Sequence, residues 1–187
     1  AEPTTITSET TSETSSDEPG GRIIFTCQVD ATAGYDQICM IDADGTGFTQ
    51  LTDDLKHEHW YPSWAPDGES FVFSGSHSGT YKIYEMDLDG NMNMVGDIEG
   101  ELYAPMISPD GTKIVFVRHI NETEHYISIM DRDGSNMKDL TNYYDAQDPI
   151  WSPDGSKILF SSLQDNSQQF YFMNPDGTTI QKVEELS

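Results

Sequence analysis

Histidines and carboxylates gather in the first third of this 187-residue chain in a pattern that could hold a metal ion. His57 and His59 are two positions apart, so an extended backbone would point both side chains to the same side. Imidazole nitrogens and carboxylate oxygens, such as those of Asp53, Asp54 and Glu58, are ligands for divalent transition metals. No ligand triad at a known spacing completes the set. A solvated acidic rim would contain the same residues, and both interpretations stay open.

Four acidic turns raise a second metal hypothesis, which is calcium. Each turn has the form Asp-x-Asp-Gly or a close variant, with the acidic or amide pairs Asp42/Asp44, Asp87/Asp89, Asp131/Asp133 and Asn174/Asp176. An EF-hand loop needs further oxygen ligands and a glutamate at its last position, and none of the four turns provides that frame. We therefore expect these residues to form hairpin turns, with calcium as the alternative and no other cofactor.

Motifs for catalysis are missing from the sequence. Gly75-Ser-His-Ser-Gly79 resembles the nucleophile elbow of hydrolases, but His77 stands where that motif needs serine. The sequence has no phosphate-binding glycine loop and no HExxH motif, and nothing marks two of its many carboxylates as a catalytic pair. We therefore predict that the protein is not an enzyme.

The two cysteines indicate the compartment. Cys27 and Cys39 flank a predicted hairpin whose midpoint at Ala33 would place them opposite each other, which favours a disulfide. Two buried free thiols are the alternative. The opening residues 1–3, Ala-Glu-Pro, look like a mature end left after signal-peptide cleavage. We expect a secreted protein, either extracellular or periplasmic.

A repeat organises the chain from residue 22 onward. Three segments open alike, and each is followed by a short apolar run and later by an acidic turn: Pro62-Ser-Trp-Ala-Pro-Asp-Gly68, Pro105-Met-Ile-Ser-Pro-Asp-Gly111 and Pro149-Ile-Trp-Ser-Pro-Asp-Gly155. Pro-Asp-Gly is a turn signal, because proline presets φ and glycine accepts a positive φ. The β-branched and aromatic runs between turns predict about four antiparallel strands per repeat. A period of about 44 residues with four strands is typical of a propeller blade.

These motifs resemble the TolB-type, WD-like β-propeller repeat. The shared features are the Pro-x-Trp-Ser-Pro-Asp-Gly opening, a strand that ends in Met-Asp, and a Leu-Thr ending at Leu51-Thr52 and Leu140-Thr141. The resemblance implies an all-β fold with four repeats per chain and a first blade without its innermost strand. The expected blades span residues 22–55, 56–98, 99–142 and 143–187. Rings of this family usually close with about six to eight blades.

Residues 1–21 differ from the repeats because they are rich in serine, threonine and acidic residues. Such a composition is typical of a disordered or O-glycosylated segment. The β-branched run Thr5, Ile6 and Thr7 favours the alternative of a strand that is added to a sheet edge. Because four blades leave the ring incomplete, we expect a homo-oligomer or polymer in which this tail pairs with a neighbouring subunit.

The predicted function is that of a non-catalytic structural subunit that self-associates into an extracellular assembly or filament. The alternative is a periplasmic or cell-surface module that binds protein or glycan partners at one face of the propeller, where we expect the loops that carry all five histidines to emerge. A net charge of −24 argues against nucleic acid as a partner. No apolar run reaches the roughly 18 residues that a membrane helix needs. Asn121 begins an Asn-Glu-Thr glycosylation sequon.

Overall fold

The computed structural model describes residues 21–29, 34–122, 124–141, 145–164 and 167–184. In these ranges the chain forms β-strands and turns and no helix, so no helix there could span a membrane. The strands make four antiparallel sheets, which we call blades 1 to 4.

Blade 1 contains β1 (Arg22–Cys27), β2 (Gln37–Asp42) and β3 (Thr49–Gln50). Blade 2 contains β4 (His59–Trp64), β5 (Ser70–Gly75), β6 (Lys82–Asp87) and β7 (Met92–Met94). Blade 3 contains β8 (Glu101–Ile107), β9 (Lys113–Asn121), β10 (Glu124–Asp131) and β11 (Lys138–Asp139). Blade 4 contains β12 (Ala146–Trp151), β13 (Ile158–Gln164), β14 (Ser167–Met173) and β15 (Gln181–Lys182).

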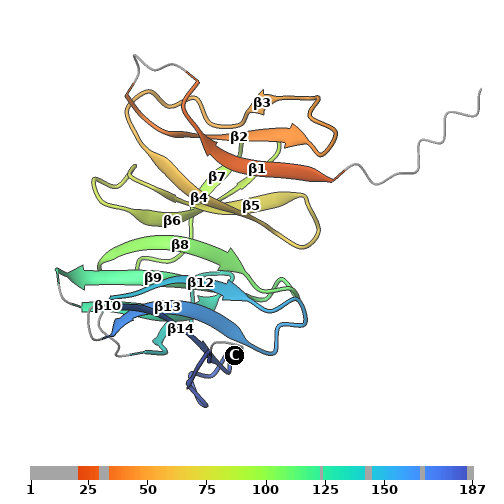
Figure 1. Cartoon of the computed structure of the whole chain (residues 1–187). Coiled ribbons are helices and arrows are strands. Elements are labelled where there is room, and N and C mark those ends of the chain that lie inside the picture. Colours follow the sequence, from red (N-terminus) through yellow and green to blue (C-terminus); the bar gives the residue numbers. More distant parts are fainter. Residues whose placement is uncertain (1–20, 30–33, 123, 142–144, 165–166, 185–187) are drawn as a thin grey trace, which may run out of the picture.

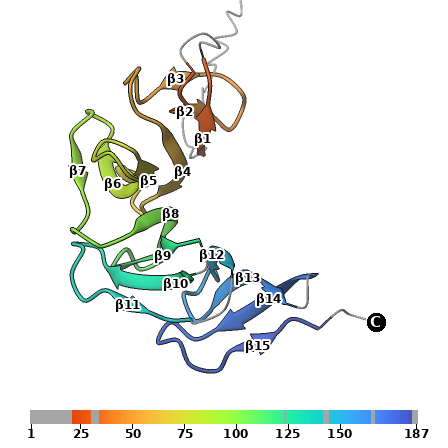
Figure 2. The same cartoon turned by 90° about the vertical axis from the view of Figure 1, so that its left-hand side faces the viewer.

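Figure 1 shows the blades stacked in chain order. Figure 2, turned by 90°, shows that they follow an arc. In each blade the strands pair in chain order, and β1 pairs with β2 alone in blade 1. The inner strands meet between neighbouring blades, with β1 against β4, β4 against β8 and β8 against β12. The prediction of a four-blade, all-β propeller chain with a three-stranded first blade is therefore confirmed.

Each junction between blades has its own hydrophobic core. Three fully buried phenylalanines at equivalent positions mark these cores: Phe73 in β5, Phe116 in β9 and Phe160 in β13. Tryptophans at the ends of inner strands also join the blades. The indole Nε1 of Trp64 donates to the carbonyl of Arg22 in blade 1 at 3.1 Å, and that of Trp151 donates to the carbonyl of Met106 in blade 3 at 3.1 Å. Hydrophobic burial at the junctions therefore stacks the blades.

The Leu-Thr endings have a structural role that the sequence motif alone did not explain. The hydroxyl of Thr52 accepts the backbone N–H of Ile38 at 2.9 Å, and that of Thr141 accepts the backbone N–H of Ile127 at 3.0 Å. Both threonines are buried. Each hydroxyl satisfies a strand donor that would otherwise be buried without a partner.

The inner strands of blades 2, 3 and 4 share a distorted backbone. Tyr61, Ala104 and Asp148 have φ values of 56°, 48° and 51°, in the left-handed region. Each residue lies directly before the proline that opens its repeat, and at each the strand register shifts by a bulge. A bulge re-aims the neighbouring side chains. The same local strain therefore recurs three times along the concave side of the arc.

A disulfide joins Cys27 and Cys39, with their Cα atoms 5.8 Å apart. The predicted register was wrong, because Cys27 pairs with Gln37 and Cys39 pairs with Phe25. The cysteines are diagonal neighbours and not directly opposite. Diagonal residues on adjacent strands share a face and remain within reach, so the disulfide forms in either register.

Removing this disulfide should destabilise blade 1. The bridge closes a short loop of sequence separation 12, for which loss of loop-closure entropy predicts about 3 kcal/mol of stabilisation. We expect the Cys27→Ala/Cys39→Ala variant to unfold at a lower urea concentration than the oxidised protein. Reduced wild-type protein is the control, because it lacks the bridge and keeps both side chains. Unchanged midpoints for the variant and the reduced protein would contradict this expectation.

Candidate binding surface on the loop face

All five histidines lie near one end of the strands. This end carries the connections between blades and, in blades 2 and 3, the loops between the second and third strands, and we call it the loop face. The histidines form two groups. His57, His59 and His77 lie at the junction of blades 1 and 2, where His77 is 4.4 Å from His57 and 4.8 Å from His59 between ring centroids. His119 and His125 stack at 3.8 Å in blade 3.

The first group differs from the predicted His57/His59 pair. The carboxylate of Asp54 meets Nδ1 of His57 at 2.5 Å and lies 3.5 Å from Nδ1 of His77. His59 is outside the set of ligand atoms that lie close together, and its Nε2 lies 2.7 Å from Nε2 of His77. Asp54, His57 and His77 are thus the three metal-capable side chains brought together in the described part of the chain. Alternation along an extended strand was expected to place His57 and His59 on the same side. His57 precedes β4, so this alternation does not apply to it.

Burial and neighbouring charge control the protonation of this group. Burial, assisted by the positive charge of a protonated His77, lowers the pKa of His59 to about 4. Burial also lowers the pKa of His77, as does the neighbouring His57, against the opposing charge of Asp54. Partial burial raises the pKa of Asp54, but hydrogen bonds from His57 and the Lys56 N–H outweigh it and lower the pKa overall. Near neutral pH the group therefore has neutral His59 and His77 rings and an ionised carboxylate.

An aromatic ladder crosses the loop face from blade 2 to blade 3. Its rungs, in order, are Trp60, Tyr81, Tyr103, His119 and His125. The ring centroids of successive rungs are 5.0, 4.9, 5.0 and 3.8 Å apart. The first three spacings are those of favourable aromatic pairs, and the stacked rings of His119 and His125 lie closer together. The ladder is therefore a preformed surface that spans two blades.

Carboxylates hold the polar ends of four rungs. Asp36 accepts from Trp60 Nε1 at 2.8 Å, Glu101 accepts from the Tyr103 hydroxyl at 2.7 Å, and Asp145 meets His125 Nδ1 at 3.2 Å. Glu58 accepts from the Tyr81 hydroxyl. Burial and these carboxylates raise the pKa of both tyrosines, so the hydroxyls stay protonated donors. The polar ends of these four rungs are therefore hydrogen-bonded, and the ladder is edged with negative charge.

Two adjoining cavities lie beside the ladder on the concave side of the inner strands. The first, of about 220 Å³, has walls from Trp60, Tyr103, His119 and other residues of blades 2 to 4. The second, of about 310 Å³, is lined mainly by the inner-strand prolines and their neighbours. Both cavities include the left-handed residues Tyr61, Ala104 and Asp148. The three bulges thus shape one continuous groove, which we call the inner groove.

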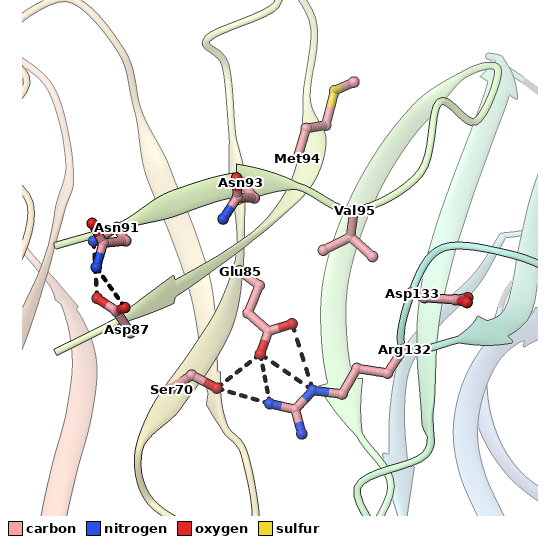
Figure 3. A pocket seen from close by; sticks show the side chains of 9 residues that line it. All are labelled: Ser70, Glu85, Asp87, Asn91, Asn93, Met94, Val95, Arg132 and Asp133. Carbon is pink, nitrogen blue, oxygen red and sulfur yellow. Dashed lines mark hydrogen bonds and ion pairs between the residues drawn. The ribbon is translucent and has the colours of Figure 1, made fainter. Parts of the chain in front are cut away.

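The opposite face carries the turns and a cavity of about 350 Å³ between blades 2 and 3 (Figure 3). The guanidinium of Arg132 projects into it and pairs with Glu85, at 2.6 Å from Nη2 to Oε1, and Nη2 also donates to the Ser70 hydroxyl at 2.9 Å. These contacts raise the pKa of Arg132, first through the Glu85 hydrogen bond. The charged side chains Arg132 and Glu85 of this cavity therefore pair with each other, and their contact joins blade 3 to blade 2.

The carboxylates of the acidic turns on this face accept hydrogen bonds from residues of the same turn. Asp87 accepts the backbone and side-chain donors of Asn91 at 2.9 and 2.8 Å, and Asp133 accepts the backbone and hydroxyl of Ser135 at 2.9 and 2.6 Å. These bonds lower the pKa of both aspartates. These two turns are therefore Asx-type turns, as expected for hairpin connections, and calcium binding stays an untested alternative.

Other predicted site residues lie apart from these surfaces. Asn121 is exposed at the end of β9, and its side chain exchanges hydrogen bonds with Glu124. Its glycosylation stays a prediction. Thr5, Ile6 and Thr7 lie outside the described residues, so the donor-strand hypothesis also stays a prediction. Sequence reasoning missed Gln37, Tyr81 and Tyr103, for which no motif gave a signal.

Comparisons with known proteins include a family model that covers most of the chain. A family model described as the TolB beta propeller domain matches residues 9–187. The Tol-Pal system protein TolB of Roseobacter denitrificans is 30% identical over 118 residues, which are 59% of this chain and 26% of that protein. An uncharacterized protein of Agrobacterium fabrum is 30% identical over 111 residues, 53% of this chain and 38% of that protein.

A solved structure shows the same arrangement of blades. It belongs to a protein assigned to TolB from Agrobacterium tumefaciens, with a TM-score of 0.76 and 26% identity. The match covers 86% of this chain and 60% of that chain. This chain therefore spans between 26% and 60% of the length of these relatives.

Proposed function

We propose, because this chain belongs to the TolB β-propeller family, that it is an exported, non-catalytic binding module whose loop face holds a basic segment of a protein partner. The carrying observation is the aromatic ladder with its edge of carboxylates beside the inner groove. The disulfide between Cys27 and Cys39 supports export to an oxidising compartment, extracellular or periplasmic.

The charge of the surface favours a cationic partner. The chain has a net charge of −24, and Asp36, Glu58, Glu101 and Asp145 edge the ladder. Complementary charge steers association and suppresses wrong partners. Lysine and arginine also bind the faces of aromatic rings through cation–π contacts. A basic segment therefore matches both the charge and the rings.

A protein segment fits this surface better than a glycan does. A neutral glycan gains nothing from the carboxylates that edge the ladder, whereas the side chains of a basic segment are attracted to them. The cavity beside the ladder holds about 220 Å³ and adjoins the second cavity of about 310 Å³. It suits a single side chain of a longer segment that continues along the inner groove.

The proposal of a non-catalytic module is supported by what two of these carboxylates do. Asp36 and Glu101 accept hydrogen bonds from the rungs Trp60 and Tyr103. His77, the histidine of the elbow-like loop, contacts His57, His59 and Tyr84 in the described part of the chain. The residues act as a recognition surface in this proposal.

Neutralising one carboxylate of the inner groove tests the proposal. Asp148 is exposed and left-handed, and asparagine tolerates that backbone, so Asp148→Asn changes the charge without new strain. We expect this variant to bind a short labelled peptide of alternating lysine and apolar residues about fivefold more weakly, which is about 1 kcal/mol. Fluorescence anisotropy at fixed ionic strength measures the binding.

The matched control is Asp89→Asn, which removes the same charge from an exposed turn on the opposite face. Its affinity for the peptide should stay within about twofold of the wild type. Equal weakening by both substitutions would mean diffuse attraction to an acidic protein and would contradict the proposed site. Binding of neutral oligosaccharides without binding of the peptide would favour the glycan alternative.

Self-association into a filament remains a separate hypothesis. Its proposed donor residues, Thr5, Ile6 and Thr7, lie outside the described part of the chain. The described geometry adds one supporting feature, since β1 is paired along one edge only within the described sheet. Such an edge can accept a further strand.

A further inference from the structure

A buried glutamine sets the hydrogen positions in the histidine group at the junction of blades 1 and 2. The amide Nε2 of Gln37 lies 2.9 Å from the carbonyl oxygen of Asp54 and 3.2 Å from that of His57. Carbonyl oxygens only accept, so the NH₂ end of the amide must face them. Its Oε1 then faces Nδ1 of His59 at 3.1 Å, and this nitrogen carries the hydrogen.

The hydrogen on Nδ1 of His59 determines the state of the next ring. A neutral His59 with that hydrogen has a bare lone pair on Nε2. This atom lies 2.7 Å from Nε2 of His77, so Nε2 of His77 must carry a hydrogen and donate it. The neutral His77 ring is then left with a bare lone pair on Nδ1.

That lone pair faces a carboxylate. Nδ1 of His77 lies 3.5 Å from Oδ2 of Asp54, and both atoms are electron-pair donors with no hydrogen between them. Nδ1 of His57 lies 2.5 Å from the same oxygen. All three atoms fall within 4.8 Å of one another. Two ligands of a tetrahedral zinc ion at 2.0–2.2 Å are themselves about 3.4 Å apart, which matches the separation of His77 and Asp54.

From this geometry we infer that Asp54, His57 and His77 form a binding site for a divalent cation of the Zn²⁺ type. The ligand atoms are Oδ2 of Asp54, Nδ1 of His57 and Nδ1 of His77. On binding, Nδ1 of His57 loses its hydrogen, Nε2 of the same ring gains one from solvent, and Nδ1 separates from Oδ2 of Asp54 from 2.5 Å to about 3.4 Å so that both coordinate the ion. Three protein ligands leave a fourth position for water or for a group from a partner.

His59 is a positioning residue in this site and not a ligand. It accepts the Nε2 hydrogen of His77 and donates its own Nδ1 hydrogen to Gln37, which fixes the orientation and tautomer of the His77 ring. Metal-binding histidines generally have such a partner on the second ring nitrogen. The side chains of His57 and Asp54 are 31% and 34% exposed, so an ion reaches the ligands from solvent.

The ion would fasten two segments of the loop face together. Asp54 and His57 belong to the connection that enters blade 2, whereas His77 belongs to the loop between β5 and β6. The ladder residue Trp60 follows the first segment, and Tyr81 follows the second. The metal site is independent of the proposed partner surface, although it lies beside it.

Calorimetric titration of the full chain with ZnCl₂ alone, after treatment with a chelator, tests this inference. We expect saturable binding of one ion per chain. Asp54→Asn and His77→Ala should each weaken that binding by at least about tenfold, or about 1.4 kcal/mol. Co²⁺ provides a second readout, because its visible absorption reports a low-symmetry site with nitrogen ligands. Thermal melting followed by circular dichroism confirms that each variant is folded.

His125→Ala is the matched control, since it also removes a histidine that contacts a carboxylate, Asp145. Its zinc affinity and stoichiometry should equal those of the wild type. No saturable binding by the wild-type chain would overturn the inference and leave a hydrogen-bonded histidine network. Equal losses in His125→Ala and Asp54→Asn, or no loss in Asp54→Asn, would also overturn it, because the ion would then bind dispersed surface carboxylates. Asp54 is partly exposed, so its variant decides the outcome if His77→Ala fails to fold.

Discussion

Replacing Gly134 with alanine should destabilise the junction of blades 2 and 3 by about 3 kcal/mol. Gly134 has φ of 86°, and a Cβ atom on it would lie 2.4 Å from the backbone nitrogen of Gly96 and 2.5 Å from its Cα. The neighbour is backbone and cannot rotate away. Left-handed strain contributes about 1–2 kcal/mol to this loss, and forced separation of the two blades contributes a further 1–3 kcal/mol.

Gly90 provides the matched control, because it occupies the equivalent acidic turn of blade 2. Its φ is 89°, and nothing lies within 4 Å of the position that a Cβ would take. Gly90→Ala should therefore cost only the backbone strain, about 1–2 kcal/mol. Urea denaturation of both variants measures the free energies of unfolding. If the two losses were equal, close packing of Gly134 on Gly96 would make no contribution.

Replacing Phe116 with alanine should cost about 3–5 kcal/mol. The ring is fully buried and belongs to the core between blades 2 and 3, where it packs with residues such as Leu102 and Ile83. Alanine would leave a cavity whose walls come from two different sheets. Because those sheets are separately hydrogen-bonded, we expect little collapse to fill the space. The free energy of unfolding in urea gives the loss directly.

Phe116→Leu is the control for this second prediction. Leucine keeps most of the apolar volume and should cost less than about 1.5 kcal/mol. The difference between the two variants then isolates the cavity from the aromatic character of the ring. A loss below about 1 kcal/mol in Phe116→Ala would show that the junction between blades can close over the gap.

The repeat made most of the fold predictable from the sequence. Pro-Asp-Gly and Asp-x-Asp-Gly are local turn signals, and the strands between them alternate as a sheet requires. The missing inner strand of blade 1 followed from the absence of a Pro-x-Trp opening before Arg22. The bulges at Tyr61, Ala104 and Asp148 could not be predicted, because a residue before proline ordinarily adopts an extended backbone.

The candidate sites were predicted less well, for a physical reason. His57 and His59 are close in sequence, but the choice between His59 and His77 as a neighbour of Asp54 depends on how a loop folds back. Gln37 reaches this group from blade 1 across the junction. Contacts of this kind between blades have no short-range spacing, so no local pattern encodes them.

The separate cores at the blade junctions have a consequence for cooperativity. Each junction buries its own phenylalanine, and the strand contacts between blades in the described ranges run between consecutive blades. The free energy of unfolding is then close to the sum of one contribution from each blade and one from each junction between neighbouring blades. One junction can open while another stays closed, so the histidine group and the aromatic ladder respond to different local fluctuations. A ligand that binds across two blades would add to the free energy that couples them, and the blades would then unfold more cooperatively.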